Sequence, residues 1–226
     1  MSVKARGHRL LREFSTPTLV VLVALASLLC VGVVTRYGFT ATGIAYAFFV
    51  VTGTWLSAID LRLRILPNRI VVPSIGLGLL LLGVAVVVDR ASASSAASAA
   101  AGAGASAAAS AAAGTAASAA PGFTGADVAA DAIRVVLGGL VLFVLYLVLA
   151  LISPRGLGMG DVKFAAFVGI YLAFDGWDTL VKGAAAGFAL AAVIGAGLIA
   201  FRRVGRGATI PFGPLMFGGA VLVLAL

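Results

Sequence analysis

The sequence predicts an all-α, polytopic membrane protein with about seven transmembrane helices and a cytoplasmic N-terminus. Of its 226 residues, 62% are hydrophobic and 11% are charged, and the mean hydropathy is +1.17. Soluble domains are nearer half apolar and a quarter charged. Lipid is therefore expected to be the main solvent of the chain. We treat residues 1–226 as a single membrane domain.

Six apolar runs approach the roughly 20 residues that a spanning helix needs. They are Pro17–Thr35, Phe39–Ile59, Ile70–Val88, Val135–Ile152, Gly183–Phe201 and Ala208–Leu226. A seventh helix is predicted over Leu157–Phe174, although its purely apolar part begins only at Phe164. Without this helix, the alternation of charge between the two sides would break. The first run lacks a clear small-x-small cleavage site, so we expect a retained helix rather than a removed signal peptide.

The distribution of basic residues predicts the orientation. With the N-terminus in the cytoplasm, twelve of the 16 Lys and Arg residues fall in cytoplasmic segments, which satisfies the positive-inside rule. The outer segments keep Arg36, Arg90, Arg134 and Lys182. Two aspartates, Asp60 and Asp161, then lie at the cytoplasmic boundary. The prediction is a multi-pass protein of the plasma (inner) membrane whose functional site faces the cytoplasm.

Residues Ala91–Ala120 consist only of Ala, Ser, Gly and one Thr. Alanine favours helix, but Ser and Gly interrupt the run, and it has no large apolar side chains. We predict a flexible extracytoplasmic loop here, and a weakly helical or re-entrant segment is the alternative.

Composition argues against several classes of function. Cys30 is the only cysteine, which excludes an internal disulfide and any multi-cysteine zinc site, and His8 is alone in a basic tail. No metal or other cofactor is therefore expected. The pI near 10.6 reflects basic residues dispersed between apolar runs, so we expect the lipid bilayer, and not nucleic acid, as their partner.

The first segment with candidate chemistry runs from Asp60 to Asn68, Asp-Leu-Arg-Leu-Arg-Ile-Leu-Pro-Asn. Asp60 ends an apolar helix, Pro67 prevents the helix from continuing, and Asn68 is placed to cap the next one. A basic turn with a proline stop accounts for Pro67 and Asn68. It does not account for Asp60, because a carboxylate at membrane depth is costly and is a functional candidate by default.

The second segment is Gly156-Leu-Gly-Met-Gly-Asp-Val-Lys163. Gly158 and Gly160 let backbone approach backbone closely, and Asp161 follows at a predicted helix start, where backbone N–H groups can orient it. The simpler interpretation is a glycine loop with an N-capping aspartate. Lys163 either biases a carboxylate pair toward ionisation or anchors the cytoplasmic boundary. A phosphate loop is disfavoured, because no Gly-Lys-Ser/Thr follows.

Two neighbouring carboxylates have a specific chemical use. Like charges a few ångströms apart share one proton, so the ionised member can take a proton from water while the protonated member donates to a carbonyl oxygen. The chain has no His-Glu-x-x-His, no Gly-x-Ser-x-Gly, and no histidine within its apolar runs. Water activation by Asp60 and Asp161 is therefore the hydrolytic chemistry that the sequence supports.

These two segments, in order, resemble the active-site motifs of the prepilin peptidase (type IV leader peptidase) family. Ile210-Pro-Phe-Gly-Pro214 is similar to the family's C-terminal signature. The resemblance implies a GxGD-type aspartyl protease in which Asp60 and Asp161 are the catalytic pair. Such enzymes remove a basic leader from prepilins or pseudopilins on the cytoplasmic side. Pro211, Gly213 and Pro214 would then shape the site, or simply limit a helix start.

The chain departs from larger members of that family in one respect. Only Thr35–Thr40 separates the first two predicted helices, and the cysteine-rich insertion of the larger enzymes is missing. The chain therefore resembles the short, peptidase-only branch, and N-methylation of the product is not expected of it. The rival interpretations are a transporter or channel component that uses the two aspartates for ion or proton passage, and a non-catalytic membrane scaffold. The oligomeric state is left open.

Overall fold

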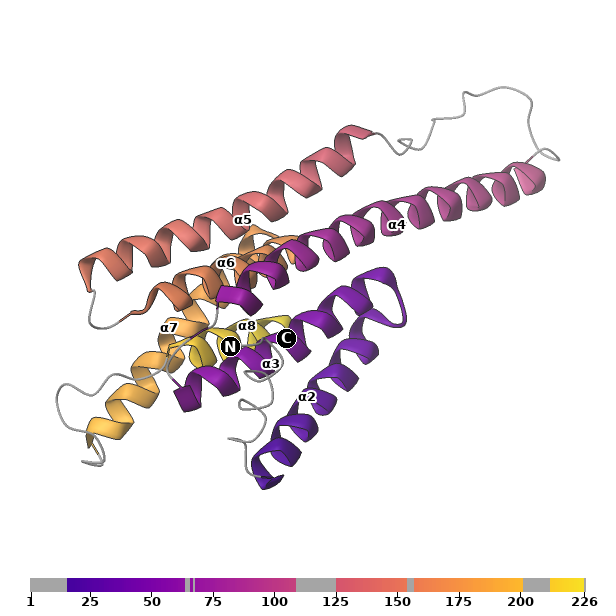
Figure 1. Ribbon diagram of the computed structural model, residues 1–226. Helices are drawn as coiled ribbons and strands as arrows, with labels where there is room; N and C mark the ends of the chain where they lie inside the picture. The colour runs from indigo at the N-terminus through magenta and orange to yellow at the C-terminus, as the bar shows by residue number, and fades with distance from the viewer. Residues whose placement is uncertain are drawn as a thin grey trace.

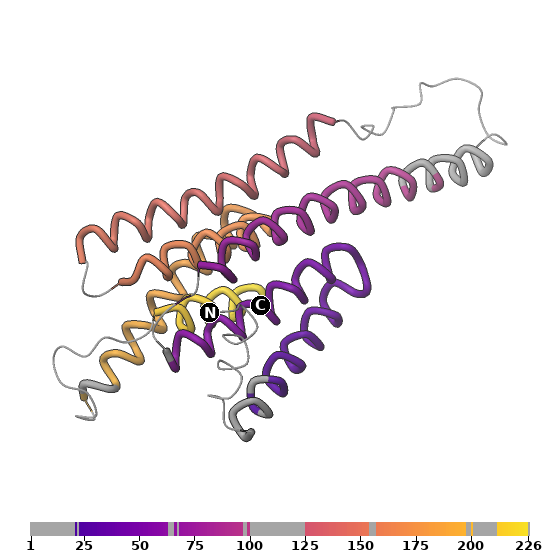
Figure 2. Tube along the Cα trace, viewed as in Figure 1, coloured from indigo at the N-terminus to yellow at the C-terminus, as the bar shows by residue number. Residues whose placement is uncertain are grey.

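The computed structural model is helical over most of the residues that it describes, which are 16–63, 66, 68–108, 125–153, 157–200 and 212–225 (Figures 1 and 2). Within these ranges there are seven α-helices and no strand. They are α2 (Thr16–Tyr37), α3 (Ala41–Leu63), α4 (Asn68–Ala108), α5 (Gly125–Ile152), α6 (Met159–Asp175), α7 (Trp177–Ala200) and α8 (Gly213–Ala225). Each predicted apolar run coincides largely with one helix, so the all-α prediction is confirmed.

The prediction of a flexible loop over Ala91–Ala120 is wrong for its first part. Helix α4 continues without interruption to Ala108 and, with α5, extends beyond the other helices in Figure 1. Alanine has the highest helix propensity, and Ser92 and Ser95 place their hydroxyls on backbone carbonyls of the preceding turn. The alternative of a helical segment therefore holds up to Ala108, and the rest of the predicted loop lies outside the described residues.

Helix α6 occupies the centre of the bundle. It contacts α4, α5, α7 and α8, and nearly all its side chains from Asp161 to Ala173 are buried. Aromatic side chains of α3 reach it as well, since Phe49 stacks on Tyr171 with ring centroids 4.6 Å apart. A helix wrapped on all sides by protein does not depend on lipid contact, which explains how a short 17-residue helix with a charged first turn is accommodated.

Close packing between α5 and α6 depends on small residues. The two helices lie side by side (Figure 2). A Cβ added at Gly169 of α6 would lie 2.7 Å from the carbonyl oxygen of Gly138 on α5, and one at Gly139 would lie 2.6 Å from the Ile170 side chain. Any larger residue would force the helices apart, as expected where backbones approach within a membrane. This contact fixes the depth of Asp161, which lies two turns before Gly169.

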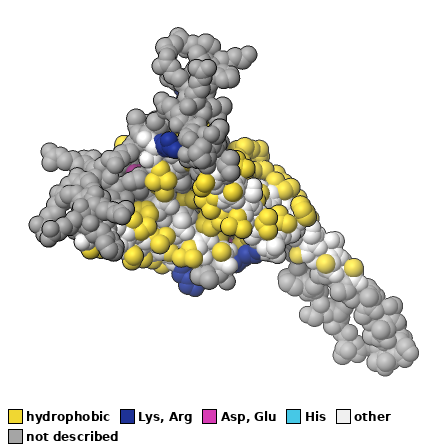
Figure 3. Space-filling model, turned by 90° about the horizontal axis from the view of Figure 1, so that it is seen from below, with side chains coloured by type: hydrophobic (Ala, Val, Ile, Leu, Met, Phe, Trp, Pro, Cys, Tyr) yellow, Lys and Arg dark blue, Asp and Glu magenta, His cyan; other side chains and the backbone are white. Residues whose placement is uncertain are grey.

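Among the described residues, four helices are long and apolar enough to cross a membrane: Ala41–Arg62, Asn68–Ala96, Gly125–Ile152 and Trp177–Gly197. Shorter apolar stretches occur over Val23–Tyr37 and Gly213–Ala225. On the described part of the face in Figure 3, hydrophobic side chains are spread across the surface, and Lys and Arg appear at only a few places. The protein is thus a helical membrane protein, and seven complete spans remain a prediction.

Charged residues at one end of the bundle pair with one another. The four basic residues that the sequence analysis assigned to the outer side each form an ion pair there: Arg36 with Asp175, Arg90 and Arg134 with Asp131, and Lys182 with Asp178. We call this the ion-pair end. The opposite end contains the end of α3 and the starts of α6 and α8.

Candidate active site

Asp60 and Asp161 are both buried. Asp60 lies in the last turn of α3 and is 5% exposed, and Asp161 lies in the first turn of α6 and is 8% exposed. The local sequence explains the position of each aspartate. The apolar run of α3 carries Asp60 to the helix end, and the glycine-rich segment lets α6 start close to its neighbours.

The two carboxylates converge on Gly213, the first residue of α8. A Cβ at Gly213 would lie 2.9 Å from Oδ2 of Asp60 and 3.6 Å from Oδ1 of Asp161. The two oxygens are therefore separated by at most the sum of these distances, about 6.5 Å. Three segments far apart in the chain thus meet at one point. A side chain at position 213 would crowd the Asp60 carboxylate, which would have to rotate away.

The backbone orients the Asp161 carboxylate. The N–H of Gly158 donates to Asp161 Oδ2 at 3.3 Å, as expected for an acidic side chain in the first turn of a helix. The other oxygen, Oδ1, is buried and has no hydrogen-bond partner among the residues that the structure describes. Helices α6 and α8 both begin here, so the positive ends of two helix dipoles lie near the carboxylates. Oδ1 is thus available to a water molecule or a substrate.

Contacts between the two motif segments hold the site together. A Cβ at Gly160 would lie 2.7 Å from Cβ of Leu66, so only glycine permits this approach. Asn68 is the first residue of α4, and its side-chain oxygen accepts a hydrogen bond from Nζ of Lys163 at 2.9 Å. Lys163 therefore ties the start of α4 to the first turns of α6.

The third motif lies beside the pair. Gly213 lies beside both carboxylates, since a Cβ added to it would meet an oxygen of each, and Pro214 lines a cavity next to the last turns of α3. Pro67 and Pro211 lie outside the described residues. The structure thus brings together Asp60, Asp161 and Gly213, and it joins Asn68 to Lys163.

Tyr146 on α5 is a neighbour of the site that the sequence analysis missed. Its side chain is fully buried, and its ring packs against Phe188 at 5.5 Å and Phe212 at 5.6 Å between centroids. It lies within electrostatic reach of Asp161, and its hydroxyl has no hydrogen-bond partner in the described part of the chain. One signal was present in the sequence: Tyr146 is the only side chain with a polar group between Val135 and Ile152.

The arrangement offers two carboxylates for acid–base chemistry. No group of three or more His, Cys, Asp or Glu side chains gathers anywhere in the described ranges. One water molecule can hydrogen-bond at about 2.8 Å to two oxygens at once if those oxygens are less than about 6 Å apart. The upper limit of about 6.5 Å on the distance between Asp60 Oδ2 and Asp161 Oδ1 allows such a separation.

Searches against protein-family models, curated proteins and solved structures find no match to this chain.

Proposed function

We propose that this protein is a membrane-embedded aspartyl endopeptidase that removes the basic leader peptide from prepilin or pseudopilin-like substrates. The observation that carries the proposal is the convergence of two buried carboxylates, from α3 and α6, on the first residue of α8. All three positions belong to the segments that resemble the motifs of the prepilin peptidase family.

In the proposed reaction, the pair of carboxylates holds one proton. The ionised carboxylate removes a proton from a water molecule held between Asp60 and Asp161, and that water attacks the scissile carbonyl carbon. The protonated carboxylate donates to the carbonyl oxygen as the tetrahedral intermediate forms. Collapse of the intermediate breaks the C–N bond, and the departing amine takes up a proton. No covalent intermediate with the enzyme is required.

Charge supports cleavage on the cytoplasmic side. The acidic pair lies at the end of the bundle opposite the ion-pair end, and the flanking segments carry most of the chain's Lys and Arg. The positive-inside rule then assigns the acidic pair to the cytoplasm of the plasma membrane. A substrate with a basic leader obeys the same rule, so its leader junction would reach the membrane on this side.

The rival proposal, a transporter or channel component, has less support. A path for protons or cations needs polar or ionisable groups at successive depths. The buried carboxylates that the structure describes are Asp60 and Asp161 at one end and Asp131 at the other. Between them the buried side chains are mainly apolar and aromatic, and their polar groups are uncharged hydroxyls. A non-catalytic scaffold would have no need for two buried carboxylates at one point.

The test is cleavage of candidate prepilins from the same genome, scored by loss of the leader in a gel-shift assay. Asp60→Ala and Asp161→Ala, made separately, are each expected to abolish cleavage while the protein still inserts into the membrane. Asp178→Ala is the control, because Asp178 is an exposed aspartate at the ion-pair end. Substantial processing by either site variant, or none by the unmodified protein with any candidate, would rule the proposal out.

A further inference from the structure

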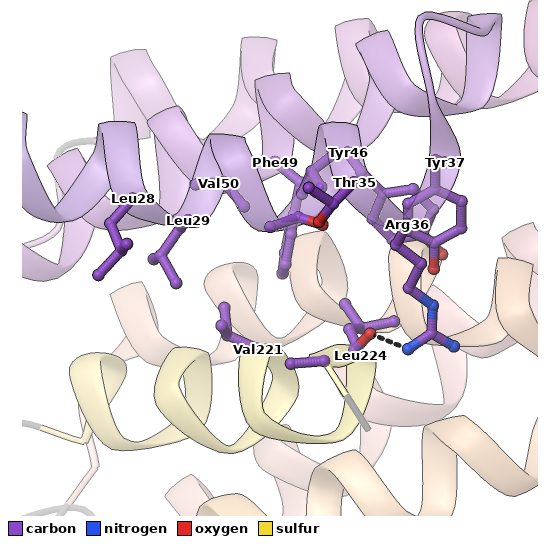
Figure 4. Close-up of a pocket in the computed structure, with 13 residues that line it drawn as sticks. Leu28, Leu29, Thr35, Arg36, Tyr37, Tyr46, Phe49, Val50, Val221 and Leu224 are labelled. Atoms are coloured by element: carbon purple, nitrogen blue, oxygen red, sulfur yellow. Dashed lines mark hydrogen bonds between the residues drawn. The ribbon is translucent and has the colours of Figure 1, made fainter.

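Two neighbouring cavities lie along α3, between α2 and α8. The first, of about 300 Å³, lies beside the last turns of α3, and the second, of about 520 Å³, lies toward the ion-pair end. Leu29 and Val221 line both cavities, so the two adjoin. Figure 4 shows the second cavity, with side chains of α2 and α3 on one side and Val221 and Leu224 of α8 on the other. We call the whole feature the α3 groove.

The end of the α3 groove near the acidic pair carries two hydroxyl groups. Thr54 and Ser57 both line it, are 4% and 8% exposed, and have no hydrogen-bond partner among the described residues. With Asp60 they occupy positions i, i+3 and i+6 of α3, which follow one another along the same side of the helix. A buried hydroxyl without a partner is costly, so this pair indicates that a polar ligand group binds here.

Arg36, the arginine that pairs with Asp175, lies at the opposite end of the α3 groove. Arg36 lines it and donates a hydrogen bond from a guanidinium nitrogen to the carbonyl oxygen of Leu224 (Figure 4). Its side chain is 40% exposed. Between the hydroxyls and Arg36, the lining side chains are apolar, among them Leu29, Val50 and Val221.

An apolar helix whose N-terminus lies at the acidic pair matches this pattern at three points. The first N–H groups of any helix lack partners, and the Thr54 and Ser57 oxygens can accept hydrogen bonds from them. The apolar middle of the groove matches the apolar body of the helix. The C-terminal end of the helix is the negative end of its dipole, and Arg36 complements it. A lipid acyl chain would leave both hydroxyls without partners.

We propose that the α3 groove binds the apolar helix of the substrate, with the backbone at its N-terminus held by Thr54 and Ser57 so that the leader junction meets the acidic pair. This assignment rests on the proposed function, since it takes the substrate to be an apolar helix preceded by a leader. It adds the binding surface and the direction of the bound helix. It also gives Thr54 and Ser57 a role in positioning the substrate.

Photocrosslinking tests the surface without requiring cleavage. A photoreactive amino acid is placed at Val221, inside the groove, or at Leu222, the next residue of α8, which is 49% exposed on the outside. The full chain carries Asp161→Asn, with Asp60→Asn as a second background, and is reconstituted with a leader-bearing substrate. At least tenfold more crosslinked substrate is expected from Val221 than from Leu222. Equal crosslinking, or lipid adducts alone at Val221, would overturn the assignment.

Kinetics test the two hydroxyls. Thr54→Val and Ser57→Ala are each expected to lower kcat/KM by about tenfold, the factor that corresponds to one hydrogen bond. The loss is expected mainly in KM, because the acidic pair is unchanged. Ser74→Ala is the matched control, since Ser74 is equally buried on α4 but its hydroxyl donates to the Ile70 carbonyl of its own helix. Rates within twofold of wild type for both groove variants would contradict the role of the hydroxyls.

The two experiments separate failure of this inference from failure of the proposed function. Cleavage by the unmodified protein without preferential crosslinking at Val221 would refute the groove and leave the peptidase proposal standing. Preferential crosslinking at Val221 without cleavage of any substrate would support the groove as a helix-binding surface and refute the peptidase.

Discussion

Asp131 and Asp161 are equally buried, at 8% exposure, and yet they lie in opposite surroundings. At the ion-pair end, Asp131 lies 2.6 Å from Arg90 and 3.2 Å from Arg134. At the other end, Asp161 has the Gly158 N–H on one oxygen, no partner on the other, and a second carboxylate close by. Burial alone therefore does not distinguish a structural carboxylate from a reactive one. The partners that surround each carboxylate make the distinction.

The difference has a free-energy consequence. Two arginines offset the cost of burying Asp131, so removal of that carboxylate is expected to leave positive charge uncompensated and to destabilise the fold. A carboxylate buried near a like charge and with an unsatisfied oxygen destabilises the fold unless it holds a proton. Residues that lower stability at one point, while well-packed helices compensate elsewhere, are typical of functional sites.

The largest expected effect is on cleavage by Asp161→Asn. The variant keeps the size of the side chain but removes its capacity for proton transfer, so the rate should fall by about 10²- to 10⁴-fold. Its thermal midpoint should stay the same or rise, because a buried charge has been removed. The measurements are leader cleavage and thermal unfolding of the purified protein. If Asp161→Asn instead lowers the thermal midpoint and retains cleavage, Asp161 is a structural carboxylate like Asp131.

A smaller loss of cleavage is expected for Gly213→Ala. The new Cβ would lie 2.9 Å from Oδ2 of Asp60, so the carboxylate must rotate, and a misplacement of this size lowers the rate by about ten- to a hundredfold. Gly76→Ala on α4 is the control, because a Cβ there would meet nothing within 4 Å. Full activity of Gly213→Ala would show that the position of the Asp60 carboxylate is not critical.

Asp131→Asn should show the opposite behaviour to Asp161→Asn. Removing this carboxylate breaks the ion pairs with Arg90 and Arg134, although Arg134 keeps its hydrogen bonds to the carbonyl oxygens of Ala173 and Phe174. The free energy of unfolding should fall by about 1–3 kcal/mol, since both arginines are partly exposed. Protein that remains folded should cleave at the wild-type rate. Thermal unfolding and cleavage, measured on the same preparation, check both statements. If cleavage by Asp131→Asn falls by more than the amount of folded protein does, Asp131 also acts in cleavage, and its contrast with Asp161 is lost.

The smallest effect is expected at Lys163. Lys163→Met removes the hydrogen bond to Asn68, which is worth about 0.5–1.5 kcal/mol, and the cleavage rate should fall only a few-fold. A double-mutant cycle with Asn68→Ala decides how Lys163 acts. If Lys163 acts through Asn68, the double variant is no worse than either single variant. Additive losses, with a shifted pH profile, would mean that Lys163 acts on the acidic pair itself.

Sequence patterns predicted the helices better than their ends. The apolar run of α5 was placed from Val135, but the helix begins ten residues earlier, at Gly125. Arg134 was counted as a charge of an outer segment, because hydropathy cannot recognise charged residues that a neighbouring helix will neutralise. Arg90 of α4 supplies that neutralisation for Asp131.

The candidate site was predictable in its residues and not in its geometry. Asp60 and Asp161 were identified from the cost of burying a charge together with their local motifs. The meeting of both with Gly213 depends on packing between helices far apart in sequence, which local patterns do not encode. Thr54 and Ser57 were overlooked, although the sequence places them six and three residues before Asp60. A threonine or serine in an apolar run is common and gives no sign by itself that its hydroxyl will lack a partner.

The contact between Gly213 and both carboxylates has a consequence for biosynthesis. Helices α3 and α6 leave the ribosome before α8, so the nascent chain carries both aspartates well before the residue that closes the site around them. The acidic pair therefore takes its final form only when α8 has been inserted. A nascent chain that stalls before Gly213 would lack the residue that completes the site, so the proposed hydrolysis would require synthesis through α8.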